Sequence, residues 1–179
     1  MSRIARGFTL LEALIAMTVV AVLACLAVPA WSSAREAAHN GSAQAALLES
    51  LLGAISHAAL TGSEVVLCPG DVAGCRATTD WSHGWVAFAD IDGDRTRGPS
   101  ETLLKIIGPL GGKVHLRSTS GRRRVVFQPN GENAGSNVTF TLCDGRGPAK
   151  AATLVMANDG RLRSGLPTAA AAADCMVER

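Results

Sequence analysis

The stretch GFTLLE at residues 7–12 decides how this chain is built. Two cations, Arg3 and Arg6, precede it, and the apolar run Phe8–Val28 contains a single acidic residue, Glu12. A helix over this run is about 32 Å long at ~1.5 Å per residue, which matches a hydrocarbon core of about 30 Å. The basic residues before it predict a cytoplasmic amino end. A carboxylate in such a segment costs very roughly 2.5–3.5 kcal/mol at the bilayer centre, so we expect Glu12 to have a partner.

Three other kinds of segment share a basic start and an apolar run. A secretory signal peptide usually has a shorter apolar region, and an acid inside it is unusual. A lipoprotein signal is loosely matched by residues 22–25, which end in Cys25. A plain single-pass anchor fits as well. The glycine at position 7, followed by Phe8 and by an acid at the fifth position counted from Phe8, favours a more specific class.

This arrangement resembles the processing site and assembly helix of type IV pilins and pseudopilins. The resemblance implies cleavage after Gly7 by a prepilin peptidase, methylation of the new amino terminus on Phe8, and assembly into a filament with other major and minor pilins or pseudopilins. In a packed filament the Glu12 carboxylate can pair with the amino group of Phe8 on a neighbouring subunit. We expect a single-pass inner-membrane protein with a periplasmic head, which then reaches the pilus or cell surface.

The apolar helix is expected to continue past Trp31 to about Leu60, because small and apolar residues, Leu48, Leu51 and Leu52 among them, recur near helical spacing. Short β runs between turns follow. They are Glu64–Cys68, Trp85–Ala89, Thr102–Ile107, Val114–Arg117, Arg124–Gln128, Val138–Cys143 and Thr153–Met156. A long amino-terminal helix packed on an antiparallel sheet is an α+β layout, and it is also the layout of pilins.

This reading divides the chain into four parts. Residues 1–7 are a cleaved leader, 8–28 a transmembrane or filament-core helix, 29–61 a helix extension that packs on the head, and 62–179 a β-rich periplasmic head. The alanine-rich tract 169–173 is expected to be a loop or one helical turn.

Four of the five cysteines lie in the predicted periplasmic part, where disulfides persist. Four cysteines allow three connectivities. We expect Cys68–Cys75, which closes a short loop, and Cys143–Cys175, which ties the carboxyl tail to a strand. A zinc site is the alternative, but no C-x-x-C and no nearby histidine pair accompany them.

The formal charge of +2 conceals an asymmetry along the chain. Residues 8–94 carry 2 basic and 9 acidic side chains, whereas residues 95–179 carry 13 basic and 6 acidic ones. Such polarity predicts one basic face that attracts polyanions, unless the two halves interleave in space and cancel. Tyr is absent and aromatic residues are 4%, which argues against a stacking platform for single-stranded nucleic acid.

The head carries motifs of its own. VVLCP at residues 65–69, Cys75, and WSHGWVAFAD at residues 81–90 together resemble the FimT/GspH family of minor pilins and pseudopilins. In that pattern Trp85 and Phe88 are expected to anchor the core, Gly84 to permit a tight turn, and Trp81 to cover a sheet edge. The family contains subunits of type II secretion pseudopili and minor pilins of type IV pili, including DNA receptors for natural transformation.

The DNA-binding members share a GRxR motif, which Gly160, Arg161 and Arg163 match here. The turn at Asp159-Gly160 presents a short strand on which the two arginines share one face. Adjacent guanidinium groups can hold phosphates bidentately. The other possibility is that these arginines are simply solvated, or pair with Asp159 and Asp174.

A second basic cluster, Arg122, Arg123 and Arg124, precedes the strand at Val125. Contacts from such clusters to phosphates give affinity that is independent of sequence and sensitive to salt. Four further cations are expected to widen the patch: Lys113, Arg117, Arg146 and Lys150.

No arrangement of residues predicts an enzyme. The four histidines are scattered, and neither G-x-S-x-G nor H-E-x-x-H occurs. The acidic run Asp90–Asp94 resembles part of a calcium loop, but its glycine precedes the third acid and Glu101 falls two residues late. We therefore expect an acidic turn there, and neither a metal nor a cofactor.

The leading hypothesis is a minor type IV pilin that binds extracellular double-stranded DNA non-specifically, chiefly through Arg161 and Arg163, for uptake in natural transformation. The alternative is a minor pseudopilin of a type II secretion system, in which the basic face would serve neighbouring subunits. A structural pilin that primes adhesive pili is a third reading.

Overall fold

The computed structural model describes residues 9–135 and 137–177, and the chain divides into two compact units, residues 1–35 and 36–179. One long helix, α1 (Leu10–Thr61), belongs to both. In the first unit its large apolar side chains are exposed, from Leu10 to Val28. Within the described residues, α1 is the one helix long and apolar enough to cross a bilayer.

The described part of the second unit contains the rest of α1 and nine strands in two sheets. The first sheet consists of β1 (Glu64–Asp71), β2 (Gly74–Cys75), β3 (Trp85–Asp90), β4 (Leu103–Ile107) and β6 (Val125–Phe127). Its order is β2-β1-β3-β4, and β6 also pairs with β1. All of these pairings are antiparallel.

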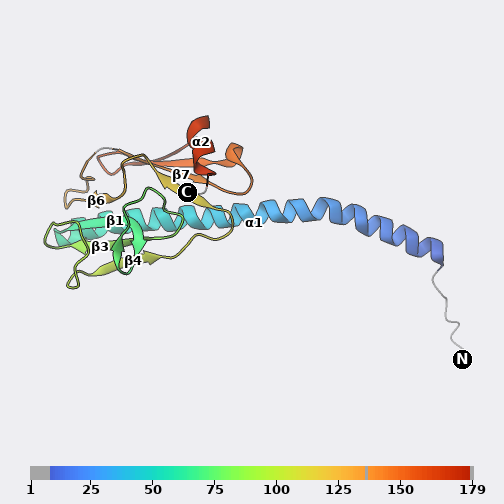
Figure 1. Cartoon of the computed structure of the whole chain (residues 1–179), viewed down its shortest axis with the longest axis horizontal. Coiled ribbons are helices and arrows are strands. Elements are labelled where there is room, and N and C mark those ends of the chain that lie inside the picture. The colour runs from blue at the N-terminus through green and yellow to red at the C-terminus, as the bar shows by residue number, and fades with distance from the viewer. Residues whose placement is uncertain (1–8, 136, 178–179) are drawn as a thin grey trace, which may run out of the picture. The chain divides into compact units, whose positions relative to one another are not determined.

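The second sheet has the order β5-β7-β8-β9 and is also antiparallel. Its strands are β5 (His115–Ser118), β7 (Val138–Cys143), β8 (Ala152–Met156) and β9 (Leu162–Gly165). A short 3-10 helix, η1 (Pro148–Lys150), precedes β8, and α2 (Ala169–Cys175) follows β9. Figure 1 shows the last turns of α1 with β3 and β4 on one side and β7 and α2 on the other.

The main core joins α1 to the inner faces of both sheets. Its largest fully buried side chains are Trp81, Trp85, Phe127 and Phe140. The Trp85 indole donates to Ser50 Oγ at 3.0 Å, which fixes α1 against the first sheet. Burying rings of this size is the dominant favourable term for so small a head.

Two expectations about the aromatic motif are corrected. Trp81 does not cover a sheet edge: it is fully buried and packs edge-on against Phe140, with ring centroids 5.1 Å apart. Phe88 is fully buried, but on the opposite face of the first sheet, in a second cluster with Val66 and Val126. Gly84 does occupy a tight turn, where a Cβ would lie 2.3 Å from the Ile107 carbonyl oxygen.

The buried stripe of α1 agrees only in part with the one expected. Leu47 and Leu51 are fully buried, whereas Leu48 and Leu52 are 37% and 49% exposed. Of the expected residues, Leu51 is thus in the core, whereas Leu48 and Leu52 lie beside the buried stripe. Small residues on both sides of the stripe make its position hard to read from periodicity. The alanine-rich tract forms a helix, α2, capped by Thr168, whose hydroxyl accepts the Ala171 N–H at 3.2 Å.

Candidate nucleic-acid interface

The GRxR segment forms a tight turn that leads into β9, the edge strand of the second sheet. The Gly160 N–H donates to the Ala157 carbonyl at 3.0 Å, and the Ala157 N–H donates to the Arg161 carbonyl at 2.9 Å. Gly160 has φ +77°, and a Cβ there would lie 2.6 Å from the Gly131 carbonyl oxygen. Only glycine suits both the backbone angle and this close approach.

Arg161 and Arg163 share the solvent-facing side of this segment. Leu162, between them, pairs with Met156 and packs partly against the main core. Because side chains alternate along a strand, both arginines point away from the core, and both are exposed. The alternation expected from the sequence is therefore present.

The two arginines differ in their partners. Arg161 Nε lies 2.6 Å from Asp159 Oδ2, in an ion pair whose arginine side chain is 81% exposed. The pKa of Asp159 is lowered, chiefly because the Arg161 backbone N–H donates to its carboxylate. The backbone of Arg163 pairs with Val155 of β8, but within the described residues its side chain makes no hydrogen bond or ion pair, so its guanidinium is available to a ligand.

The triple arginine lies on the turn before β6. Arg123 and Arg124 are exposed, and Arg124 Nη1 donates to the Arg95 carbonyl at 3.0 Å. Arg122 is half-buried against Gly135, where an added Cβ would lie 2.5 Å from its Nη1. The three side chains are thus not equivalent, and Arg123 is the most open of them.

A single loop, residues 128–135, touches both basic segments. Asn133 donates its backbone N–H to the Asn158 carbonyl at 2.9 Å and its side chain to the Ala157 carbonyl at 3.1 Å. The same loop places Gly131 under Gly160 and Gly135 against Arg122. The two arginine clusters of the sequence are therefore connected through a few contacts in the fold.

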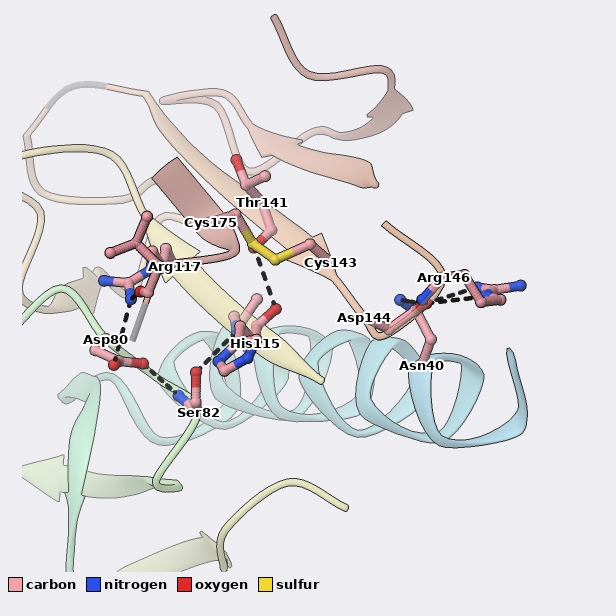
Figure 2. The surroundings of a disulfide bond; sticks show 12 residues. Asn40, Asp80, Ser82, His115, Arg117, Thr141, Cys143, Asp144, Arg146 and Cys175 are labelled. Carbon is pink, nitrogen blue, oxygen red and sulfur yellow. Dashed lines mark hydrogen bonds and ion pairs between the residues drawn. A yellow bond between two sulfur atoms is a disulfide. The ribbon is translucent and has the colours of Figure 1, made fainter. Parts of the chain in front are cut away.

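Two cations that were expected to widen the patch do not. The side chain of Arg117 is 8% exposed, lies 3.9 Å from Asp80 and donates to the Val177 carbonyl. Arg146 donates two hydrogen bonds to the buried Asp144 carboxylate, from Nε at 2.8 Å and from Nη2 at 2.7 Å. Each of these arginines thus has an acidic partner within the head, Asp80 for Arg117 and Asp144 for Arg146 (Figure 2).

Disulfides join Cys68 to Cys75 and Cys143 to Cys175, the pairing expected from the sequence, with Cα–Cα distances of 5.4 and 6.1 Å. The first closes the β1–β2 hairpin. The second ties α2 to β7 (Figure 2) and so encloses the GRxR segment in a covalent loop. Cys25, on α1, is exposed and unpaired.

The acidic run forms a hydrogen-bonded turn. Asp90, Asp92 and Asp94 lie with one carboxylate oxygen each within 4.8 Å of one another. Asp90 accepts the backbone N–H groups of Gly93 and Arg95 at 3.0 and 3.2 Å. The carboxylates thus shape their own loop, as an acidic turn does.

Glu12 is exposed in the first turn of α1, where its backbone N–H donates to Thr9 Oγ1 at 3.3 Å. Gly7 and Phe8, the expected cleavage and methylation positions, lie outside the described residues. The pairing of Glu12 with a neighbouring amino terminus stays a prediction.

Two family profiles match the chain. The prokaryotic N-terminal methylation motif matches residues 2–27, and the profile described as type II transport protein GspH matches residues 43–160. The chain belongs to the GspH family. Membership implies a type IV pilin-like subunit that is processed by prepilin peptidase, is anchored by its apolar helix, and assembles with other pilins or pseudopilins.

The fold of this GspH-family chain is that of a solved minor pilin. The type IV minor pilin FimU of Pseudomonas aeruginosa superposes with a TM-score of 0.53 at 17% identity, over 71% of this chain and 89% of FimU. A second crystal form of FimU covers 71% and 94% of the two chains at 17% identity, with a TM-score of 0.48. No curated protein sequence matches the chain. The expected α+β layout, a long helix with antiparallel sheets, is confirmed.

Proposed function

We propose that this GspH-family subunit is a minor type IV pilin, of the FimT branch, that binds extracellular double-stranded DNA for uptake in natural transformation. Arg161 and Arg163 supply the main contacts. The mature chain starts at Phe8, sits in the inner membrane with its amino end in the cytoplasm and its head in the periplasm, and enters a pilus through residues 8–28.

One observation carries the proposal: Arg161 and Arg163 stand exposed on either side of the inward-facing Leu162, on a turn that Gly160 fixes. Two neighbouring guanidinium groups suit adjacent phosphate oxygens. A backbone held this rigidly loses little freedom when it binds. Contacts to phosphate alone accept any sequence, which an uptake receptor requires.

A second function deserves a parallel test because the matching family is described as a type II transport protein. In a secretion pseudopilus the same arginines would meet carboxylates of neighbouring subunits or of exported protein. Deleting the gene separates the two functions: a minor DNA-uptake pilin is needed for transformation, whereas a pseudopilin is needed for enzyme secretion.

The direct test is DNA binding by the mature full-length chain in non-ionic detergent micelles, followed by fluorescence anisotropy with a short duplex of mixed sequence. Arg161→Gln with Arg163→Gln should reduce the slope of log affinity against log salt by about 1.8, since each lost phosphate contact removes ~0.9. Arg35→Gln, which removes an exposed charge from α1 outside the basic patch, is the matched control. Equal affinities for the wild type and the double variant would remove the proposal.

A gain of affinity is a sharper test than a loss. Asp159→Asn keeps an oxygen that can accept the Arg161 N–H but removes the carboxylate that occupies the Arg161 guanidinium. Exposed ion pairs are weak, so we expect DNA affinity to rise about two- to fivefold at low salt and the gain to shrink as salt increases. A fall in affinity, with the head still folded, would mean that Arg161 does not face the phosphates.

A further inference from the structure

Arginines from three separate loops meet around one open cleft of about 680 Å³. The loops are residues 73–77, which include β2, and residues 95–97 and 121–124. Among the described residues, the lining has no acidic and no aromatic side chain. Six of the lining residues are arginines: Arg76, Arg95, Arg97, Arg122, Arg123 and Arg124. Among these loops, the sequence predicted a basic cluster only at residues 122–124. The segment with Arg76 even belongs to the acidic part of the chain, residues 8–94.

Neighbouring acids compensate only part of this charge. Arg76 pairs with Asp71 at 2.7 Å, and Arg95 lies 3.7 Å from Glu64. The Arg76–Asp71 pair is exposed, so phosphate can compete for the Arg76 guanidinium at little cost. The Arg95–Glu64 pair is half-buried and longer, and it offsets part of the charge of Arg95.

Three of the arginines keep their full charge. Arg97 Nη1 donates to the Val72 carbonyl at 2.6 Å, and Arg124 Nη1 donates to the Arg95 carbonyl. These acceptors are neutral, so they position the guanidinium groups without cancelling them. Arg123 is exposed and has no partner within the described residues. A cleft with three uncompensated guanidinium groups is an anion site.

We infer that this arginine cleft holds the sugar–phosphate backbone of one strand of the DNA duplex that the GRxR turn contacts. The inference rests on the proposed function and extends the contact surface to a second place on the head. The lining favours a duplex over a free strand, because proteins that bind single strands stack the bases on aromatic side chains. Contacts to phosphate in the cleft, like those at the turn, do not depend on the base sequence of the DNA.

The cleft and the turn are joined by the loop 128–135. Ala134 lines the cleft, Asn133 is bonded to the residues before the turn, and Gly131 lies under Gly160. A duplex that follows this loop meets Arg161 and Arg163 first and the cleft next.

The slope of log DNA affinity against log salt concentration measures how many phosphate groups the head contacts. With five phosphate contacts, from Arg161, Arg163 and the three uncompensated cleft arginines, affinity should fall about 500-fold between about 50 and 200 mM salt, at a slope of ~0.9 per contact. The turn variant, Arg161→Gln with Arg163→Gln, keeps three contacts, and its affinity should fall about 40-fold over this range. The cleft variant, Arg97→Gln with Arg123→Gln and Arg124→Gln, should lose only about 12-fold.

The cleft variant could misfold, because Arg97 and Arg124 also donate hydrogen bonds to backbone carbonyls of neighbouring loops. Single substitutions of Arg123, which has no such bond among the described residues, provide a second test. Arg123→Gln should lower the slope by about 0.9, and Arg123→Lys should preserve it. Arg35→Gln, on α1 and outside the cleft lining, should leave the slope unchanged. Thermal unfolding of the same samples shows whether each variant is folded.

The outcomes separate the two proposals. If the turn variant loses slope while Arg123→Gln and the folded cleft variant behave as the wild type, the cleft inference is overturned and the proposed function stands. If the wild type does not bind the duplex, or if neither variant differs from it, both fail. If the cleft substitutions weaken binding of a sulfated polysaccharide but not of the duplex, the cleft serves another polyanion and the inference is again overturned.

Discussion

Asp144 should be the most stability-critical carboxylate of the head, and Asp144→Asn tests this. Its side chain is fully buried and accepts the Asn40 amide at 2.7 Å, besides the backbone N–H and guanidinium of Arg146. It thus joins the end of β7 to α1 (Figure 2). The asparagine keeps the shape of the side chain but removes its charge and one acceptor oxygen.

The expected loss follows from these contacts. Breaking a fully buried ion pair costs about 3–5 kcal/mol. The Arg146 side chain is 23% exposed and can turn partly to water, so we expect the lower end, about 3 kcal/mol. For a head of this size each kcal/mol shifts the melting temperature by about 2–4 °C, which gives a drop of about 6–12 °C.

The same substitution has a defined pH signature. The hydrogen bond from Arg146 is the main cause of the lowered pKa of Asp144 in the folded protein. A carboxyl whose folded pKa lies below its unfolded value of about 3.9 stabilises the fold above that pH, and this contribution is lost as the pH falls through the folded pKa. The difference between the wild type and Asp144→Asn should therefore be full at pH 7 and shrink below about pH 4.

Near-UV circular dichroism, to which the buried Trp81 and Trp85 contribute, follows the unfolding of the head. Asp159→Asn is the matched control, because both acids stand in the tripeptide Asp-Gly-Arg and both pair with the arginine two residues on. The control pair is exposed, so its loss should leave the melting temperature nearly unchanged. A shift for Asp144→Asn no larger than that of the control would refute the reasoning.

Three further predictions concern assembly, the turn and the tail. Glu12→Ala should insert and be cleaved normally but enter filaments poorly, because the amino terminus of the next subunit loses its anion; normal amounts in sheared filaments on immunoblots would contradict this role. Gly160→Ala should destabilise the turn by about 1–3 kcal/mol and weaken DNA binding, whereas Gly53→Ala, in open space on α1, should do neither; anisotropy and melting curves measure both. Replacing Cys143 and Cys175 by serine should lower the free energy of unfolding by roughly 2–5 kcal/mol, and denaturant titration that finds no loss would show that the tail is held by packing alone.

Local patterns predicted the elements better than their grouping. The long helix and seven strands follow from apolar periodicity and turn residues, and the structure places each within a few residues of its expected bounds. The two-residue β2 carries no such pattern. That the strands form two sheets on both sides of α1 depends on packing between segments distant in sequence, which no local signal encodes.

The site shows the same division. Alternation along β9 predicted the shared face of Arg161 and Arg163, since it needs only the strand. The two Asp-Gly-Arg tripeptides look alike in sequence, yet one is buried against Asn40 and the other is exposed. The arginine cleft was missed because its loops come together only through the β1–β2 hairpin and the turn before β6.

The bond between Cys143 and Cys175 has a mechanical consequence. The segment it closes contains β8, the GRxR turn, β9 and α2. If the turn binds DNA as proposed, tension on the DNA would load the covalent ring on both sides of the turn. The force then could not separate the tail from the sheet one hydrogen bond at a time. Under that proposal the disulfide would strengthen β9, an edge strand, against the pull of a bound polymer.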